Sequence, residues 1–276
     1  MGIRVSPITK IFFYIIMLGF TAVALYPLFW LFIQSFKTSR EYLTAGAPAF
    51  PKLWFSGNYP YAWQMGKFGT LFFNSIFYSG VTAILVVVFS LMAGFAFAKI
   101  KLRITPFLYG LFVIGILLTL QSIMAPLFLM ESAVGLINTR LGVVIPYIGL
   151  GLPMGIYLCT EFIKSIPNEL IESGRLDGAG YLRIFRSIIF PMCAPVAVPL
   201  GIITFAGTWN EFMLINILAS SDAAASIPVG LNRFSGALAS DYPFAALVIG
   251  LVPVLIFYAI FRKQITKGVV AGFGNR

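Results

Sequence analysis

Six apolar runs, each long enough to cross a lipid bilayer, set the class of fold that this chain can adopt. The first run covers residues 11–33, about 23 residues, and about 20 apolar residues in a helix cross the hydrocarbon core. It is too long for the apolar region of a signal peptide, about 7 to 15 residues, so we expect it to remain as a span. We predict an all-α integral membrane protein, a single transmembrane domain over residues 1–276. The predicted spans are residues 11–33, 71–98, 107–130, 143–162, 192–219 and 244–261.

Composition supports the same class and excludes others. Of 276 residues, 59% are hydrophobic and 10% are charged, whereas a soluble domain has about 25% charged residues. The sequence has no histidine, the commonest general base and metal ligand, so we expect no metal site. The net charge of +10 is dispersed between apolar runs without a nucleic-acid motif, so we expect contact with membrane lipid and no nucleic-acid partner. Cys159 and Cys193 lie in or beside apolar runs and indicate no disulfide framework.

The basic residues are distributed unequally between the two sets of span ends. Thirteen lie at the ends that include both termini and residues 166–191, and six lie at the opposite ends. By the positive-inside rule the larger set is cytoplasmic, which places both termini and the 166–191 loop in the cytosol. The larger set is Arg4, Lys10, Lys99, Lys101, Arg103, Lys164, Arg175, Arg183, Arg186, Arg262, Lys263, Lys267 and Arg276, and the smaller set is Lys37, Arg40, Lys52, Lys67, Arg140 and Arg233.

Residues 166–191 form the most polar long segment. Pro167 suits the first turn of a helix, and Glu169 and Glu172 lie where the helix dipole favours negative charge. Gly178 permits a turn or a close approach, so we predict two helical pieces that meet at this glycine.

The second of these pieces is predicted to be amphipathic. Leu182, Phe185 and Ile189 recur at helical spacing, while Arg183 falls off that face. Such a segment suits the membrane surface and a groove in a soluble partner. The alternative is an ordinary amphipathic cytoplasmic loop.

The spacing within the loop resembles the EAA loop of bacterial ATP-binding-cassette importer permeases. That motif reads Glu-Ala-Ala, three residues, Gly, nine residues, then Ile-x-Leu-Pro; here the alanines are replaced by other small residues and the leucine by Phe190. The resemblance implies a type I importer permease, with a cytoplasmic coupling helix between the fourth and fifth spans. The coupling residues that it implies are Glu169, Glu172, Ser173, Gly174, Asp177, Gly178, Ala179, Ile188 and Pro191.

Further stretches resemble the carbohydrate-uptake branch of these permeases, and nearest the smaller permease of maltose-type transporters. They are Asn74-Ser75, residues 135–139, Ile166-Pro167-x-Glu169-Leu170, Asp177-Gly178-Ala179 and Trp209-Asn210-Glu211-Phe212. The resemblance covers nearly the whole chain. It implies carbohydrate import, of an oligosaccharide above all, across the bacterial cytoplasmic membrane by alternating access. The implied partners are a second related permease, two cytoplasmic ATPases that use ATP and Mg, and an extracytoplasmic sugar-binding protein.

Polar residues inside the spans are the candidates for the substrate pathway. Glu211 is the clearest, since a carboxylate in mid-span costs about 2.5 to 3.5 kcal/mol on insertion scales and normally faces a cavity or a partner. Trp209 and Asn210 beside it offer an aromatic face and an amide, which suit a sugar, and Asn74 and Gln121 extend the set. The alternative for each residue is a hydrogen bond that holds helices together.

Two other classes of protein remain to be weighed. A secondary transporter coupled to ions or protons depends on carboxylates inside the membrane and often shows repeated halves, but only Glu211 lies deep in a span and no repeat is evident. A membrane enzyme requires a catalytic set that the sequence does not display. There is also no G-x-x-x-x-G-K-[ST] phosphate loop, so we expect no cofactor on this chain and ATP hydrolysis on other subunits.

Overall fold

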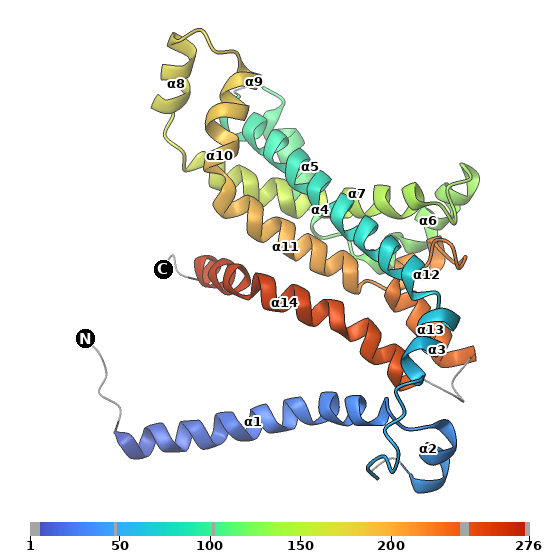
Figure 1. Cartoon of the computed structure of the whole chain (residues 1–276). Helices are drawn as coiled ribbons and strands as arrows, with labels where there is room; N and C mark the ends of the chain where they lie inside the picture. Colours follow the sequence, from blue (N-terminus) through green and yellow to red (C-terminus); the bar gives the residue numbers. More distant parts are fainter. Residues whose placement is uncertain (1–5, 47–48, 101–102, 238–242, 274–276) are drawn as a thin grey trace. The chain divides into compact units, whose positions relative to one another are not determined.

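The computed structural model describes residues 6–46, 49–100, 103–237 and 243–273, and the regular structure in these ranges is helical (Figure 1). Arg4, Lys101 and Arg276, three of the basic residues counted above, lie outside the described residues. The chain divides into two compact units, residues 1–68 with 231–255 and residues 69–230 with 256–276. The interpretation of the whole chain as one permease domain stays a prediction.

The first unit contains α1 (Pro7–Gln34), α2 (Ser39–Ala45), α3 (Asn58–Met65) and the first half of α14 (Pro243–Phe273). The helix α1 begins before the predicted apolar run because Ser6 caps it: the Ser6 hydroxyl accepts a hydrogen bond from the Thr9 amide at 3.3 Å. At the other end, the Asn58 side-chain amide donates to the carbonyls of Ser35 and Lys37, at 2.7 and 2.8 Å. This buried amide thus satisfies backbone acceptors just beyond α1 and fixes α3 against them.

The second unit carries the predicted loop and four of the predicted spans. Its helices are α4 (Phe68–Lys99), α5 (Thr105–Gly115), α6 (Leu120–Ala133), α7 (Arg140–Lys164), α8 (Glu169–Leu176), α9 (Tyr181–Ile184), a π-helical turn η1 (Phe185–Ile189), α10 (Phe190–Met192), α11 (Ala194–Asn210), α12 (Met213–Leu218), the start of α13 (Ile227–Ala237) and the second half of α14. The helices α4 and α7 approach closely through small residues. A Cβ on Gly94 would lie only 3.0 Å from the Cys159 Cβ, and Gly155 lies against Ser90 in the same way.

Each predicted span corresponds to helical structure, but two of them are not single straight helices. In the described residues, four helices are long and apolar enough to cross a membrane, and the number rises to six if each bent pair is one span. The third predicted span is α5 followed by α6, bent by 101°, and the entry to the fifth is bent by 76° before α11. The predicted fifth span, 192–219, is broken again at Glu211 and Phe212, between α11 and α12. Periodicity of apolar residues does not reveal such bends, because the pattern within one helix carries no information about its angle to the next helix.

The helix α7 is continuous from Arg140 to Lys164 although it contains Pro146 and Pro153. Internal prolines can unwind a helix locally, but α7 shows no break at either of them. A proline ring presses on the carbonyl of the residue four positions earlier, and those residues are Gly142 and Gly149. Glycine lets that part of the backbone adjust, so the helix passes each proline without a break.

Gly142→Ala is expected to destabilise the fold by about 1 to 3 kcal/mol, the usual cost of overpacking. A Cβ at Gly142 would collide with the Leu136 carbonyl and lie 2.6 Å from Glu131 Oε2 in a buried site. Gly149→Ala in the same helix is the matched control, because nothing lies within 4 Å of its Cβ. The measurement is thermal unfolding of both variants in lipid nanodiscs, and equal midpoints for the two would contradict the packing described.

Candidate coupling loop and polar sites of the spans

The 166–191 segment folds as two short helical pieces joined by a turn, as predicted. The first piece is α8, which begins at Glu169 with Asn168 before it, two residues later than Pro167 indicated. The second runs through α9, η1 and α10, from Tyr181 to Met192. Figure 1 shows α8 and α9 at one end of their unit, with the chain returning through α10 into α11.

Gly178 makes the turn between the two pieces. Its φ is +76°, a left-handed conformation that glycine adopts without a steric penalty. The Gly178 amide donates to the Arg175 carbonyl and the Ala179 amide to the Gly174 carbonyl, both at 3.0 Å. This pair of bonds is the Schellman arrangement that ends a helix, so the backbone conformation itself favours the glycine predicted at the junction.

The inner side of the loop is anchored in the main apolar core of the unit. This core contains Leu91 and Phe95 of α4, Cys159 and Ile163 of α7, Ile166, Ile171 of α8, Ile184 of α9, Ile189, Cys193 and Leu200. Gly174 is buried, and its Cβ position lies 3.3 Å from Ile188 Cδ1 and 3.4 Å from Ile184 Cγ1. A small residue at 174 is therefore needed for α8 to cross the second piece. Gly174 and Ile188, both predicted to couple to an ATPase, pack the loop internally.

The predicted apolar face of the second piece is wrong at Leu182, whose side chain is 75% exposed, while Ile184 is buried. The cause is the π-helical turn that follows, in which the Phe190 amide donates to the Phe185 carbonyl. A π turn adds a residue and shifts the helix face. Pro191 has no amide hydrogen to donate, and in a regular α-helix its ring would clash with the carbonyl of the residue four positions earlier. Both effects favour the π-helical turn.

The outer side of the loop presents most of the remaining predicted coupling residues. Glu169, Glu172, Ser173, Asp177, Gly178 and Pro191 are exposed, and Ala179 is half-buried. Two large apolar side chains lie on this side as well, Leu176 at 89% exposed and Leu182. Sequence reasoning missed Leu176, because no local pattern shows which leucine of a short helix is exposed. Exposed leucines among charged residues form a surface that a soluble partner can cover.

Glu211 lies in the break between α11 and α12, where its carboxylate caps α12. Glu211 Oε1 accepts from the Met213 amide at 2.8 Å, and both oxygens accept from the Leu214 amide at 3.2 Å. Oε2 also accepts from the Ile215 amide at 3.3 Å and from the Tyr147 hydroxyl of α7. The carboxylate thus replaces the lost helical bonds and joins α12 to α7, next to the positive end of the α12 dipole.

The other predicted pathway residues do not all gather around Glu211. Trp209 is buried and stacks on Phe205 with ring centres 5.8 Å apart, and the exposed Asn210 donates to the Ala206 carbonyl at 2.8 Å. Gln121 is exposed in the first turn of α6. These contacts do not show that any of the residues lines a substrate pathway, and that role stays a prediction.

Asn74 is fully buried and holds a distant segment of the chain. Its amide donates to the carbonyls of Ala223 and Ala225, at 2.8 and 3.0 Å, and its oxygen accepts from Arg140 Nε at 3.3 Å. This geometry favours the alternative considered above, a residue that ties structure together.

A match to a protein-family model shows which family this chain belongs to. The model described as binding-protein-dependent transport system inner membrane component matches residues 90–270. The chain belongs to this family. The match includes the whole 166–191 loop, and membership excludes the secondary-transporter alternative. This permease is a multi-pass inner-membrane transport component.

Relatives match nearly the whole permease. A putative ABC transporter permease, ORF2, from Caldicellulosiruptor sp. (strain Rt8B.4) is 32% identical over 96% of each chain. The trehalose transport system permease SugB of Mycobacterium tuberculosis is 30% identical over 90% of this chain and 92% of its own. The multiple sugar-binding transport system permease MsmG of Streptococcus mutans is 32% identical over 90% and 91%.

One solved structure has the same fold. It is a bacterial ABC transporter involved in the import of the acidic polysaccharide alginate, and the matched chain is 22% identical. The TM-score is 0.79, over 95% of this permease and 99% of that chain. The likeness confirms the predicted importer-permease fold.

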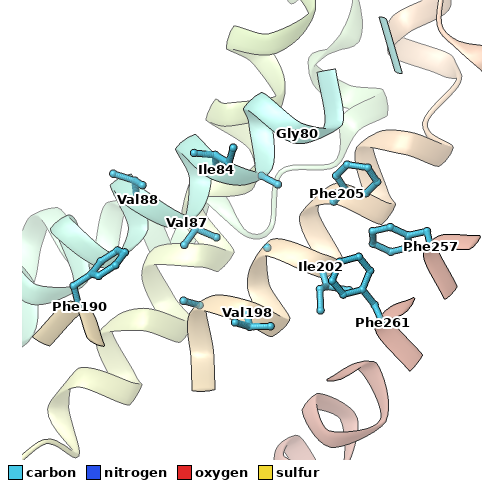
Figure 2. Close-up of a pocket in the computed structure, with 13 residues that line it drawn as sticks. Gly80, Ile84, Val87, Val88, Phe190, Val198, Ile202, Phe205, Phe257 and Phe261 are labelled. Carbon is cyan, nitrogen blue, oxygen red and sulfur yellow. The ribbon is translucent and has the colours of Figure 1, made fainter. Parts of the chain in front are cut away.

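The permease also has an apolar groove of about 580 Å³ in its second unit. Figure 2 shows side chains of α4, α11 and the second half of α14 around it, among them Val87, Ile202 and Phe257. Its lining has no polar side chain and contains none of the predicted pathway residues. A sugar is recognised by polar groups placed among apolar ones, so this groove is unsuited to a carbohydrate.

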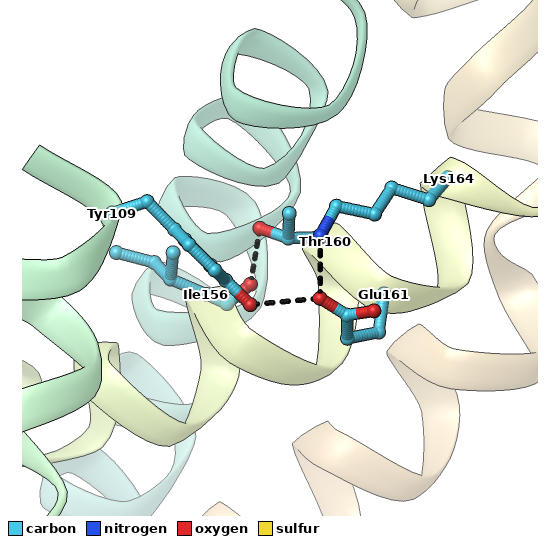
Figure 3. A network of polar contacts seen from close by, with 5 residues as sticks. All are labelled: Tyr109, Ile156, Thr160, Glu161 and Lys164. Atoms are coloured by element: carbon cyan, nitrogen blue, oxygen red, sulfur yellow. Dashed lines mark hydrogen bonds and ion pairs between the residues drawn. The ribbon is translucent and has the colours of Figure 1, made fainter. Parts of the chain in front are cut away.

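A polar cluster that the sequence analysis missed joins α5 to α7 just before the loop. Glu161 Oε1 accepts from the Tyr109 hydroxyl at 2.9 Å and from Lys164 Nζ at 2.8 Å (Figure 3). Lys164 Nζ also lies 5.2 Å from the centre of the Tyr109 ring. Both charged side chains are about half exposed, so the ion pair itself adds little stability and the cluster mainly orients the last turn of α7.

Proposed function

We propose that this permease carries a carbohydrate, specifically an oligosaccharide, across the bacterial cytoplasmic membrane. The observation that carries this proposal is similarity over nearly the whole chain to permeases named for trehalose, for multiple sugars and for diacetylchitobiose. The family name implies a binding protein, which here would deliver the sugar from outside. Membrane lipid surrounds the spans, and nucleic acid has no part.

We further propose that energy enters through the outer side of the 166–191 loop. Two cytoplasmic ATPases, which bind ATP and Mg, would cover its exposed carboxylates together with Leu176 and Leu182. This chain would bind no cofactor and would pair with a second, related permease to enclose the pathway. The buried inner side of the loop supports this, because motion imposed on the outer side reaches α4 and α7 through packed side chains.

The orientation belongs to the same proposal. The distribution of basic residues places the loop and both termini in the cytosol, the compartment that holds ATP. A thiol near Gly178 that reacts only with reagents added outside intact cells would contradict it.

The test is uptake of labelled di- and trisaccharides by proteoliposomes that contain the full importer and ATP. Accumulation should require both ATP and the binding protein and should withstand an uncoupler that leaves ATP intact. The same vesicles without the binding protein are the control. Accumulation that survives ATP removal and collapses with the uncoupler would contradict the whole proposal. ATP-driven uptake of a non-carbohydrate solute alone would contradict only the proposed substrate class.

A further inference from the structure

The last residue of α4, Lys99, holds the entrance of the 166–191 loop. Its ammonium group donates to the Ile166 carbonyl at 2.5 Å and to Asn168 Oδ1 at 2.8 Å. Asn168 in turn begins α8, because its carbonyl accepts from the amides of Ile171 and Glu172, both at 2.9 Å. One half-buried ammonium thus fixes the residue from which α8 starts, through two hydrogen bonds in which the donor carries the charge.

The same turn of α4 also contacts the second piece of the loop. The buried Phe95 ring lies 5.7 Å from that of Phe185 and 6.5 Å from that of Tyr181. Arg175 of α8 donates to the Tyr181 hydroxyl at 2.5 Å, which joins the two pieces to each other. The last turn of α4 and both pieces of the loop are therefore connected as one assembly.

The opposite end of α4 holds another loop. Besides Asn74, the Tyr78 hydroxyl donates to the Ala224 carbonyl at 2.7 Å, and the Ser75 hydroxyl accepts from the Ile227 amide at 2.9 Å. Residues 223–227 are thus bound to the first turns of α4 by buried side chains. The helix between the two ends has 32 residues without a break, about 48 Å at 1.5 Å per residue.

We propose that Lys99 is a positioning residue that keeps α8 attached to α4 through the whole transport cycle, so that α4 transmits movement of the loop to residues 223–227. This inference rests on the proposed function. An unbroken helix held by hydrogen bonds at both ends moves as a unit, whereas a loop attached by apolar contacts alone can slip along it. Removal of the Lys99 bonds should therefore separate ATP hydrolysis from transport.

The first experiment measures sugar accumulated per ATP hydrolysed by the complete importer in proteoliposomes. For Lys99→Met, which keeps a long apolar side chain, ATP hydrolysis should stay within about twofold of wild type while the ratio falls about tenfold, as the loss of charge-assisted bonds predicts. Lys99→Arg retains donors and should restore most of the ratio. Arg103→Met removes a cytosolic charge from an exposed residue just beyond α4 and should change nothing. An unchanged ratio in Lys99→Met would overturn the inference.

The second experiment tests permanence of the contact and remains decisive if Lys99→Met fails to assemble. Cysteines replace Lys99 and Asn168 in a chain whose buried Cys159 and Cys193 are changed to serine, and a short bifunctional thiol reagent links them. Lys99→Cys already removes the ammonium group, so the unlinked double variant should show the lowered ratio expected for Lys99→Met, and the link should restore most of the wild-type ratio. A link that leaves the ratio low, or that abolishes transport, would show that permanent attachment of α8 to α4 does not serve transport and would overturn the inference. Failure of the proposed function is distinct, because wild-type vesicles would then lack ATP-driven uptake.

Discussion

Gly178→Asp is expected to abolish sugar uptake in an importer whose permease still folds and inserts. Within the chain the substitution is mild: nothing lies within 4 Å of a Cβ at Gly178, and aspartate tolerates the left-handed conformation better than most residues. The local cost is therefore about 1 kcal/mol. A side chain and a negative charge would nevertheless project from the outer side of the turn, where the proposed ATPase contact leaves no space.

Gly135→Asp is a closely matched control for this experiment. Gly135 is also exposed, also has a positive φ, +71°, and also has nothing within 4 Å of its Cβ. It lies between α6 and α7, on the side of the membrane that the basic residues assign to the exterior. Uptake should be lost only in Gly178→Asp, with both variants present at wild-type amounts in membranes.

Cross-linking gives the positive counterpart. A cysteine at Asp177 should form a link to the ATPase subunit, and a cysteine at Gly135 should not. Normal uptake by a well-expressed Gly178→Asp variant would remove the assignment of residues 166–191 as the coupling loop.

Glu211→Ala should lower uptake at least about tenfold. It should also lower the free energy of unfolding by about 2 kcal/mol or more, because the cap at the break between α11 and α12 is lost. Alanine leaves the amides of Leu214 and Ile215 and the Tyr147 hydroxyl without their acceptor, and Leu214 and Ile215 are buried. Unsatisfied donors at a buried helix start are costly because no water reaches them.

Glu211→Gln separates the hydrogen bonds from the charge. One amide oxygen can still accept from the two buried backbone amides, so uptake should stay within about threefold of wild type. Met213→Ala, two residues further on and exposed, keeps the backbone amide that Glu211 accepts from, so it is the control and should have little effect. Labelled-sugar uptake and thermal unfolding of all three variants make the comparison. Wild-type uptake by Glu211→Ala would refute the capping role, and full loss in Glu211→Gln would mean that the charge itself is required.

The sequence by itself determined the membrane class, the location of the long apolar helical segments and the turn at Gly178. Each follows from a constraint that acts locally: bilayer thickness sets the length of an apolar run, and a left-handed residue that ends a helix is most readily glycine. The spacing from Glu172 to Pro191 also identified the family, because the intervals between the residues of a motif can be counted directly in the sequence. These features need no knowledge of which residues meet in space.

Tertiary structure alone decided which side chains of the loop face inward and why the fifth span breaks. Leu182 and Ile184 differ in burial because a π-helical turn shifts the face that simple periodicity assigns. Glu211 accepts one of its hydrogen bonds from the Tyr147 hydroxyl, and Lys99 donates to the Ile166 carbonyl and to Asn168 Oδ1. Such pairs are far apart in sequence, and a hydrogen bond depends on distance and direction in space, which no local pattern of residues records.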